Sequence, residues 1–432
     1  MRGEPLQPLQ AWAVVFVTNR FFSSYNFKQL KKLSDRFVFY AIVLQEQKQQ
    51  IIAAKQEHYF KQIHVAPAAS PLIPGVLQAD AVKSAIFKIV SHASKLTIIC
   101  NDDVNMQLAA ELRSNYRYLA DRGLTCRQAQ LFSDKLANKH LLRTAGVNVP
   151  AFTRFSLNQF KASWMGYYNQ LVRRFGPKLI LKPFNAASSR GLVICHNISD
   201  FQNLETKSSL PLDNYEVESY VDGTLYHCDS VVNKGKIIFS VVAEYNRPMG
   251  EFLQGTAIGS LTLPDDDIVS VKIQAFAHDI LRKLGMPDGA SHMEIFRDPY
   301  TNKLTFLEVA ARCPGGLAIA SYKKQYGFDM LYADFCVQVG KAITQKPIRR
   351  LHAFWALFPY EKGRVSSVSL PWQQVSGSRV DEWKIKQGQV LAHASRDLSE
   401  IALATLIWDG NAPWVKARFA ELAEIPSVVS TL

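Results

Sequence analysis

The sequence ASHMEIFRDPYTNKLTFLEVAARCPGG, residues 290–316, is the most informative stretch of this chain. Two alternating segments, His292–Arg297 and Leu304–Arg312, flank a turn-forming stretch and predict a β-hairpin. Side chains alternate between the two faces of a strand. If the numbers of paired residues sum to 602, Glu294 therefore lies directly opposite Glu308.

The two glutamates have a chemical consequence. Carboxylates side by side among apolar neighbours repel each other and lose hydration. A divalent cation removes this conflict, and oxygen ligands suit Mg²⁺, which usually keeps waters and takes its other ligands from phosphates. The alternative is an exposed hairpin face with two solvated glutamates. The pattern therefore predicts a magnesium site at Glu294 and Glu308, with a solvated pair as the rival interpretation.

Composition narrows the class of protein. The chain has 432 residues, of which 48% are hydrophobic and 20% charged, so we expect a globular protein of two or three domains. Its net charge of +13 favours anionic ligands such as nucleotides, acyl phosphates or nucleic acid. The basic residues occur as scattered pairs without a nucleic-acid-binding module, so nucleic acid is not expected as a partner.

The cysteines and apolar runs indicate a cellular setting. Six widely spaced cysteines form no CxxC pair, which favours a reduced, cytoplasmic protein. The apolar run Ala11–Val17 is short and follows prolines, so it predicts a first strand rather than a secretion signal. No stretch approaches the roughly 20 apolar residues that cross a bilayer, and a membrane is not expected as a partner.

The N-terminal part alternates short apolar runs with helical patterns. The run at residues 12–17 is continuous, as in a strand buried on both faces of a parallel sheet. Repetition of this pattern predicts an open α/β domain over about 1–125. Asn101, Asp102 and Asp103 follow the fourth strand directly, where capping of the next helix is favoured over substrate contact.

A helix over Lys135–Thr144 follows, with Ser133 as its expected N-cap. Beyond it, strands at 178–182 and 192–196 are joined by a loop of small residues. Small side chains let backbone N–H groups approach phosphate oxygens, and Lys182 at the end of the first strand adds a point charge. Without a G-x-x-x-x-G-K signature, however, this loop is a weak phosphate signal.

Two further segments complete the candidate site. Backbone groups of Glu218–Val221 are placed to hydrogen-bond the edge of a flat heterocycle. The glycine-rich segment 244–263 is irregular in sequence, and we expect it to be a lid, since long loops in compact domains are usually lids or disordered.

Taken together and in this order, these pieces resemble the ATP-grasp superfamily, and within it carboxylate–amine ligases such as the L-amino-acid ligases. The most specific part is Glu308-Val-Ala-Ala-Arg-Cys-Pro-Gly-Gly. The resemblance covers about 1–430 and implies an α/β (α+β) ATP-grasp fold. Three regions are implied: a Rossmann-like, open parallel pre-ATP-grasp domain at 1–125, a small (B) subdomain with preceding helices at 126–220, and a large (C) subdomain with a C-terminal extension at 221–432.

The resemblance also implies roles for individual residues. Two lysines would hold the ATP phosphates, two serines would close over them, one glutamate would accept a hydrogen bond from the adenine amino group, and two backbone positions would pair with the ring edge. In that order these residues are Lys135, Lys182, Ser188, Ser189, Glu218, Tyr220 and Val221.

At the reacting end, Glu294 and Glu308 would bind one or two Mg²⁺ ions. Arg312 would stabilise charge on an acyl phosphate and a tetrahedral intermediate, with a structural salt bridge as its alternative role. His292 is expected to be a packing residue on the strand face rather than a ligand.

Two positions depart from the pattern of the family. Many members have Asn two residues after the second acid, where this chain has Ala310. Relatives often have a glutamate that contacts the ribose, where this chain has Leu225 or Tyr226; His227 and Asp229 are the substitutes.

The expected function is that of an ATP-dependent carboxylate–amine ligase, which forms an amide through an acyl phosphate and releases ADP and phosphate. Its cofactors would be ATP and Mg²⁺, and its partners a small-molecule carboxylate and an amine. The resemblance also admits a homodimer. The alternatives are an ATP-binding sensor without ligation and a small-metabolite kinase of the same fold.

Overall fold

The computed structural model describes residues 11–70, 73, 75–120, 122–184, 190–208, 211–372, 377–425 and 428–431. The chain forms two compact units. The first comprises residues 1–133, 287–289 and 331–343, and the second comprises residues 134–286, 290–330 and 344–432.

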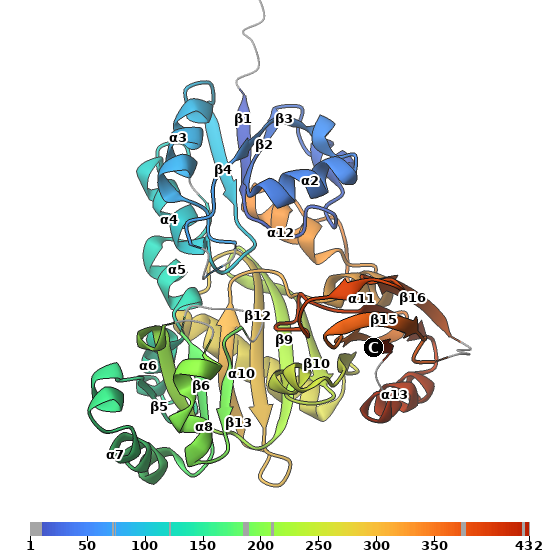
Figure 1. Ribbon diagram of the computed structural model, residues 1–432. Coiled ribbons are helices and arrows are strands. Elements are labelled where there is room, and N and C mark those ends of the chain that lie inside the picture. The colour runs from blue at the N-terminus through green and yellow to red at the C-terminus, as the bar shows by residue number, and fades with distance from the viewer. Residues whose placement is uncertain are drawn as a thin grey trace, which may run out of the picture. The chain divides into compact units, whose positions relative to one another are not determined.

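The first unit contains a parallel four-stranded sheet in the order β3-β2-β1-β4 (Figure 1). Every residue of its central strand β1 is buried, as expected for β-branched and aromatic residues in a parallel sheet. The predicted open parallel α/β domain is therefore confirmed. The strands are β1 (Trp12–Val17), β2 (Phe37–Val43), β3 (Phe60–Val65) and β4 (Lys95–Ile99). The helices are α1 (Phe27–Lys31), α2 (Gln45–Ala53), η1 (Glu57–Tyr59), α3 (Ala79–Val90), α4 (Met106–Asn115), α5 (Cys126–Ser133) and most of α12 (Met330–Gln338).

The second unit is organised around an eight-stranded sheet in the order β13-β12-β9-β10-β11-β14-β18-β16. Its strands are β9 (Thr224–Asn233), β10 (Lys236–Tyr245), β11 (Ile258–Thr262), β12 (Gly289–Arg297), β13 (Leu304–Ala310), β14 (His352–Phe358), β16 (Ser378–Trp383) and β18 (Leu403–Asp409). Helix α10 (Ile268–Leu284) packs against β9 and β10, and α11 (Ala318–Tyr326) packs against β14 and β18.

A smaller antiparallel sheet in the same unit has the order β5-β8-β6-β7. Its strands are β5 (Phe152–Arg154), β6 (Leu179–Pro183), β7 (Val193–Cys195) and β8 (Tyr215–Ser219). The accompanying helices are α6 (Lys135–Thr144), α7 (Leu157–Phe175), α8 (Ile198–Gln202), α9 (Leu204–Lys207) and η2 (Leu212–Asn214).

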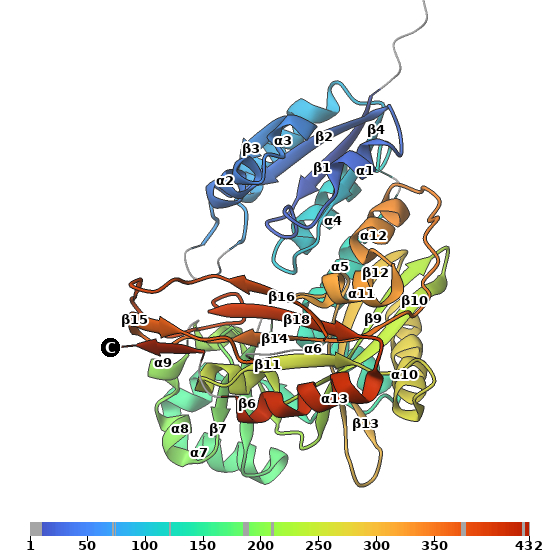
Figure 2. The ribbon, with the colours of Figure 1, turned by 90° about the vertical axis from the view of Figure 1, so that its right-hand side faces the viewer.

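The C-terminal part of the second unit has a core of its own. Helix α13 (Ala412–Ala420) lies along β11, β14 and β18 (Figure 2). Phe354, Ile407 and Phe419 pack together in this core. The remaining elements are β15 (Gly363–Val368), β17 (Val390–Leu391), β19 (Val429–Thr431) and η4 (Glu421–Glu424), of which the three strands form a separate sheet.

The hairpin has the predicted register at the acid pair. Strands β12 and β13 are antiparallel, and Glu294 lies directly opposite Glu308. The register shifts by one residue between Glu294 and Ile295. Between the shift and the turn the numbers of paired residues sum to 601, so the shift is what brings Glu308, rather than Leu307, opposite Glu294.

Two local predictions were wrong. Asp134, not Ser133, caps α6: its Oδ1 accepts hydrogen bonds from the backbone N–H groups of residues 136 and 137. Ser133 instead ends α5 and donates to the Ala129 carbonyl. Segment 244–263 is not irregular throughout, because it holds the end of β10, the 3-10 helix η3 (Met249–Gln254) and the buried strand β11, while its role as a lid stays a prediction.

Among the described helices, none combines the length and the apolar character that crossing a membrane requires.

Candidate active site

A cleft in the second unit brings together most of the residues that the sequence singled out. Its walls come from the start of α6, from β6, β7 and β8, from η3 and from the β12–β13 hairpin. The predicted site residues that line it are Lys135, Lys182, Glu218, Tyr220, Val221, Glu294 and Glu308. Ser188 and Ser189 lie outside the described residues.

The cleft has an apolar wall and a charged wall. Apolar side chains from β6, from β7 and the residue before it, and from β9, η3 and the hairpin include Ile180, Leu192, Ile194, Leu225, Met249, Phe296 and Leu307. A flat heterocycle buries favourably against such a surface, whereas the lysines and glutamates suit the phosphate and metal end of a nucleotide. Leu225 therefore belongs to the apolar wall of the cleft.

Lys135 is held beside the acid pair by the start of α6. Its backbone N–H donates to the Phe184 carbonyl at 3.1 Å, and its ammonium lies 3.4 Å from Glu308 Oε2. Burial alone would raise the pKa of Glu308, but the positive charges of Lys135 and Lys182 outweigh it and lower that pKa. The carboxylate therefore stays ionised and able to bind a cation.

A second group of charges, here called the balanced cluster, consists of Lys139, Lys182, Glu216 and Glu218. The Lys139 ammonium lies 2.7 Å from Glu216 and also contacts Glu218, and the other oxygen of Glu218 lies 3.0 Å from Lys182. The side chains of Lys139 and Glu216 are completely buried. Burial lowers the pKa of Lys139 to about 7, assisted by Lys182 and opposed by Glu216. Burial also lowers the pKa of Lys182, although Glu216 opposes the change.

The balanced cluster alters the interpretation of Glu218. Both of its carboxylate oxygens contact lysines, so an adenine amino group would compete with Lys139 and Lys182 for them. Sequence reasoning missed Lys139 and Glu216. Their signals were present, because Lys139 follows Lys135 by four residues on one helix and Glu216 shares a strand face with Glu218.

Arg312 lies just beyond β13 and is buried. Its guanidinium donates to the Cys313 carbonyl at 2.9 Å and lies close enough to Glu308 to lower the pKa of that acid. The following turn needs glycine, since Gly316 has φ +59° and a Cβ there would stand 3.2 Å from the Trp355 ring. The positively charged guanidinium of Arg312 is therefore held near Glu308.

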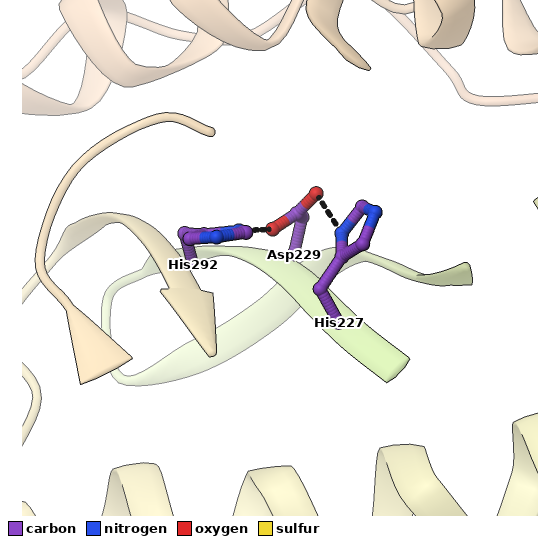
Figure 3. Close-up of side chains that lie close together, drawn as sticks. All are labelled: His227, Asp229 and His292. Atoms are coloured by element: carbon purple, nitrogen blue, oxygen red, sulfur yellow. Dashed lines mark hydrogen bonds and ion pairs between the residues drawn. The ribbon is translucent and has the colours of Figure 1, made fainter. Parts of the chain in front are cut away.

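A group here called the acid-rich cluster consists of His227, Asp229, His292, Glu294 and Glu308. Asp229 is completely buried and lies between the two imidazoles (Figure 3). His227 Nδ1 is 2.9 Å from Asp229 Oδ2, and His292 Nδ1 is 2.6 Å from Asp229 Oδ1. His292 Nε2 faces Glu294 Oε1 at 3.7 Å.

Neighbouring groups fix this cluster further. The Tyr322 hydroxyl donates to Asp229, His227 Nε2 contacts Ser260 Oγ at 2.7 Å, and the Tyr245 hydroxyl donates to Glu294 at 3.4 Å. Burial opposes ionisation of Asp229, but the two imidazoles outweigh it and hold its pKa far below the ordinary value. Burial likewise opposes protonation of His292, yet Asp229 and Glu294 raise the pKa of that imidazole to about 9.

The acid-rich cluster changes two predictions made from the sequence, one on ribose contacts and one on His292. His227 and Asp229 are almost fully buried and bonded to each other, so neither is placed to contact a ribose as the sequence suggested. His292 is not simply a packing residue, because it links Asp229 to Glu294.

One ion pair joins the cleft to the C-terminal part of the second unit. Arg190 lines the cleft, and its Nε lies 3.2 Å from Asp397 Oδ2, which its terminal nitrogen also contacts. Asp397 is buried and accepts a hydrogen bond from the Ser399 backbone at 2.8 Å. Sequence reasoning missed this pair, since 207 residues separate its members.

The chain is similar to known proteins at low sequence identity. No family model matches. It is 22% identical over 333 residues to an L-arginine-specific L-amino acid ligase from Bacillus subtilis, covering 74% of this chain and 77% of the relative. It is 25% identical over 219 residues to the carbamoyl phosphate synthase large chain of Helicobacter pylori, covering 49% of this chain and 19% of that protein.

Solved structures give a longer alignment. An L-amino acid ligase from Bacillus licheniformis superposes with a TM-score of 0.69 at 12% identity, covering 98% of this chain and 99% of that chain. The biotin carboxylase domain of a Hydrogenobacter thermophilus 2-oxoglutarate carboxylase was solved with MgADP and bicarbonate. It superposes with a TM-score of 0.64 at 13% identity, covering 98% of this chain and 91% of that chain. The comparisons confirm the predicted fold and resemblance: the chain has the ATP-grasp fold and is similar to carboxylate–amine ligases.

Proposed function

We propose that this chain, which has the ATP-grasp fold, is an ATP-dependent ligase that joins a small carboxylate to an amine through an acyl phosphate. The observation that carries the proposal is one cleft that combines an apolar wall, two lysines and a directly opposed pair of glutamates. The named relatives include ligases, which supports the same class of reaction.

The nucleotide would lie along the cleft. Its base would pack on the apolar wall beside Tyr220 and Val221, and its phosphates would lie against Lys135 and Lys182. Glu218 would keep Lys182 oriented or accept from the base after an exchange of partners, since both of its oxygens contact lysines.

Glu294 and Glu308 are the residues that would hold one or two Mg²⁺ ions. The donor set fits, because two opposed carboxylates supply the hard oxygen ligands that Mg²⁺ prefers. Bound magnesium would neutralise charge on the phosphates.

The chemistry follows from the leaving groups. A carboxylate resists attack because its leaving group is oxide. Its oxygen would therefore take the γ-phosphoryl group, with the bond to ADP breaking, to form an acyl phosphate. A neutral amine would then attack the carbonyl carbon, so that a C–N bond forms while the C–O bond to phosphate breaks and the amine proton is released. Lys135, Lys182 and Arg312 would position these anions and stabilise their charge.

Substrate-dependent release of ADP tests the proposal. The protein is incubated with ATP, Mg²⁺ and pooled amino acids and amines, and products are identified by mass spectrometry. An amide with stoichiometric ADP and phosphate is expected, and Glu308→Gln should abolish it. A stable phosphorylated product would indicate a kinase instead. ATP binding without turnover on any pool would favour a sensor and overturn the ligase proposal.

A further inference from the structure

We infer that His292 is a third protein ligand of the cation held by Glu294 and Glu308, which makes this site suited to Mn²⁺ and similar nitrogen-tolerant divalent ions as well as to Mg²⁺. The inference rests on the proposed function, because it concerns the same metal site. It assigns to this site a nitrogen ligand where the sequence suggested carboxylates alone.

The first observation is the orientation of the imidazole. His292 Nδ1 lies 2.6 Å from Asp229 Oδ1, and because a carboxylate only accepts, Nδ1 carries the hydrogen of this bond. Metal-binding histidines almost always donate their second ring N–H to a carboxylate or another acceptor in this way, which fixes the ring and raises its basicity as a ligand. The Asp229–His292 pair has this arrangement.

The second observation is the direction of the other ring nitrogen. His292 Nε2 faces Glu294 Oε1 at 3.7 Å. Two ligands of one octahedral ion with bonds of about 2.1 Å are separated by about 3 Å when adjacent and about 4 Å when opposite. The observed separation falls between these values, so a single ion can contact both atoms after a small adjustment. The ion would displace the proton that Asp229 and Glu294 stabilise on this imidazole, since a histidine ligand binds in its neutral form.

The third observation is the space beside the ring. On β13, the residue directly opposite His292 is Ala310, which shares a strand face with Glu308. Its methyl group offers no ligand and takes little volume beside the imidazole. His292 keeps 13% of its side chain exposed, whereas the Asp229 side chain behind it is completely buried.

The fourth observation is the rigid support behind the ring. Asp229 also accepts from Tyr322 and His227, and His227 in turn contacts Ser260. The position of Asp229 is thus fixed by three elements, β9, β11 and α11. Figure 3 shows the two histidines on either side of this carboxylate, with His292 extending from β12, the strand that also carries Glu294.

The two histidines provide a matched pair of variants. Both contact Asp229, but His227 Nε2 is bonded to Ser260 while His292 Nε2 faces Glu294. His292→Gln removes the proposed ligand, and His227→Gln perturbs the same network without removing it. Thermal unfolding of both variants would show that each one is folded.

The experiment measures Mn²⁺ bound to the full-length protein with ADP. Free Mn²⁺ is quantified by electron paramagnetic resonance, and electron spin-echo modulation reports nitrogen bonded to the ion. The wild type should show a directly bonded nitrogen that is retained in His227→Gln and lost in His292→Gln. The His292 variant should bind Mn²⁺ about 10-fold more weakly or worse, and the His227 variant should stay within about 3-fold of the wild type.

The outcomes separate the two proposals. Mn²⁺ that binds to the wild type with no bonded nitrogen, or with a nitrogen signal that survives in His292→Gln, overturns the ligand role of His292 and leaves the proposed function standing. A wild type that binds no Mn²⁺ with ADP overturns both. Labelling the protein with ¹⁵N-histidine during expression should change the modulation pattern, which distinguishes the imidazole nitrogen from the adenine nitrogens.

Discussion

The balanced cluster and the acid-rich cluster lie in the same unit but differ in how their carboxylates are neutralised. In the balanced cluster, Glu216 and Glu218 each contact the ammonium of Lys139, and Lys182 adds a second positive charge. In the acid-rich cluster, Glu294 contacts a tyrosine hydroxyl and an imidazole. The protein supplies the counter-charges of the first cluster. In the second cluster, Lys135 supplies part of the counter-charge at Glu308, and the proposed Mg²⁺ would supply the rest.

This difference separates residues that support the fold from residues that bind a ligand. A buried ion pair whose partner is removed destabilises the protein strongly, because a charge is left without compensation. A carboxylate whose partner is an exogenous cation can lose its charge with little effect on folding and a large effect on binding. Substitutions in the balanced cluster should therefore lower stability more than binding, and substitutions of Glu294 or Glu308 should lower binding more than stability.

Lys139→Met should have the largest effect on stability. The substitution leaves Glu216 and Glu218 buried with only Lys182 as a positive partner, so we expect a loss of about 3–5 kcal/mol in the free energy of unfolding. Urea unfolding monitored by circular dichroism measures it. Lys161→Met, at an exposed position of α7, is the control and should change stability by less than about 0.5 kcal/mol. Equal stabilities of the two variants would contradict the contrast.

Glu294→Gln should have the reverse profile. The amide keeps the shape of the side chain and can still accept from Tyr245, so we expect the unfolding free energy to change by no more than about 1 kcal/mol. Loss of a metal-binding carboxylate should lower turnover about 100-fold or more, since even supporting residues of metal sites contribute about 10–100-fold. ADP release at several Mg²⁺ concentrations measures the effect. A variant that unfolds yet retains turnover per folded molecule would reverse the assignment.

The pH dependence of the free energy of unfolding should report the protonation of Lys139 in the balanced cluster. The pKa of Lys139 is about 7 in the folded protein and 10.5 ordinarily, so between these values the unfolded chain holds more protons. The contribution of Lys139 therefore rises with pH across this window, by at most about 1.4 kcal/mol per pH unit, and is least favourable below pH 7.

Urea unfolding at pH 7, 8 and 9 measures this contribution. The wild type should gain stability relative to Lys139→Met as the pH rises, which cancels the titration of other lysines and tyrosines common to both proteins. The charged groups that act on Lys139 include Glu216, Glu218, Lys182 and Lys135. Parallel pH profiles would mean that Lys139 stays protonated in the folded state.

The same contrast explains what could be predicted from the sequence. Alternation within one hairpin, which is local information, limits which residues can share a face, but the opposition of Glu294 and Glu308 also required an assumed register, which the observed pairing has at the acid pair. The contact of Asp229 with His292 joins residues 63 positions apart on different strands, so it depends on how the sheet is assembled. Asp134 rather than Ser133 caps α6 because two adjacent residues of similar capping propensity were available, and the tertiary structure decided between them.

The segment 244–263 shows the limit of composition as a guide. Its glycines indicated an irregular loop, but Gly259 lies in β11 at a point where a Cβ would stand 2.8 Å from the Trp355 carbonyl. The glycine is there for close packing of strand on strand, not for mobility. Sequence alone does not distinguish a glycine that allows close packing from a glycine that allows backbone mobility.

Asp397→Asn should produce the smallest effect. It tests whether its partner Arg190 mainly supports the fold or mainly binds the ligand. Arg190 is 28% exposed and Asp397 is buried, so the pair lies between a surface ion pair and a buried one. Burial would raise the pKa of Asp397, but Ser399 and Arg190 outweigh it and lower that pKa, so the charged form is favoured. We expect a loss of about 1 kcal/mol in stability and a change of about 3-fold or less in ATP affinity, measured by urea unfolding and calorimetry. If Arg190 instead belongs with the ligand-binding residues, ATP affinity should fall more than stability, and Arg190→Lys should weaken ATP binding without reproducing the stability change.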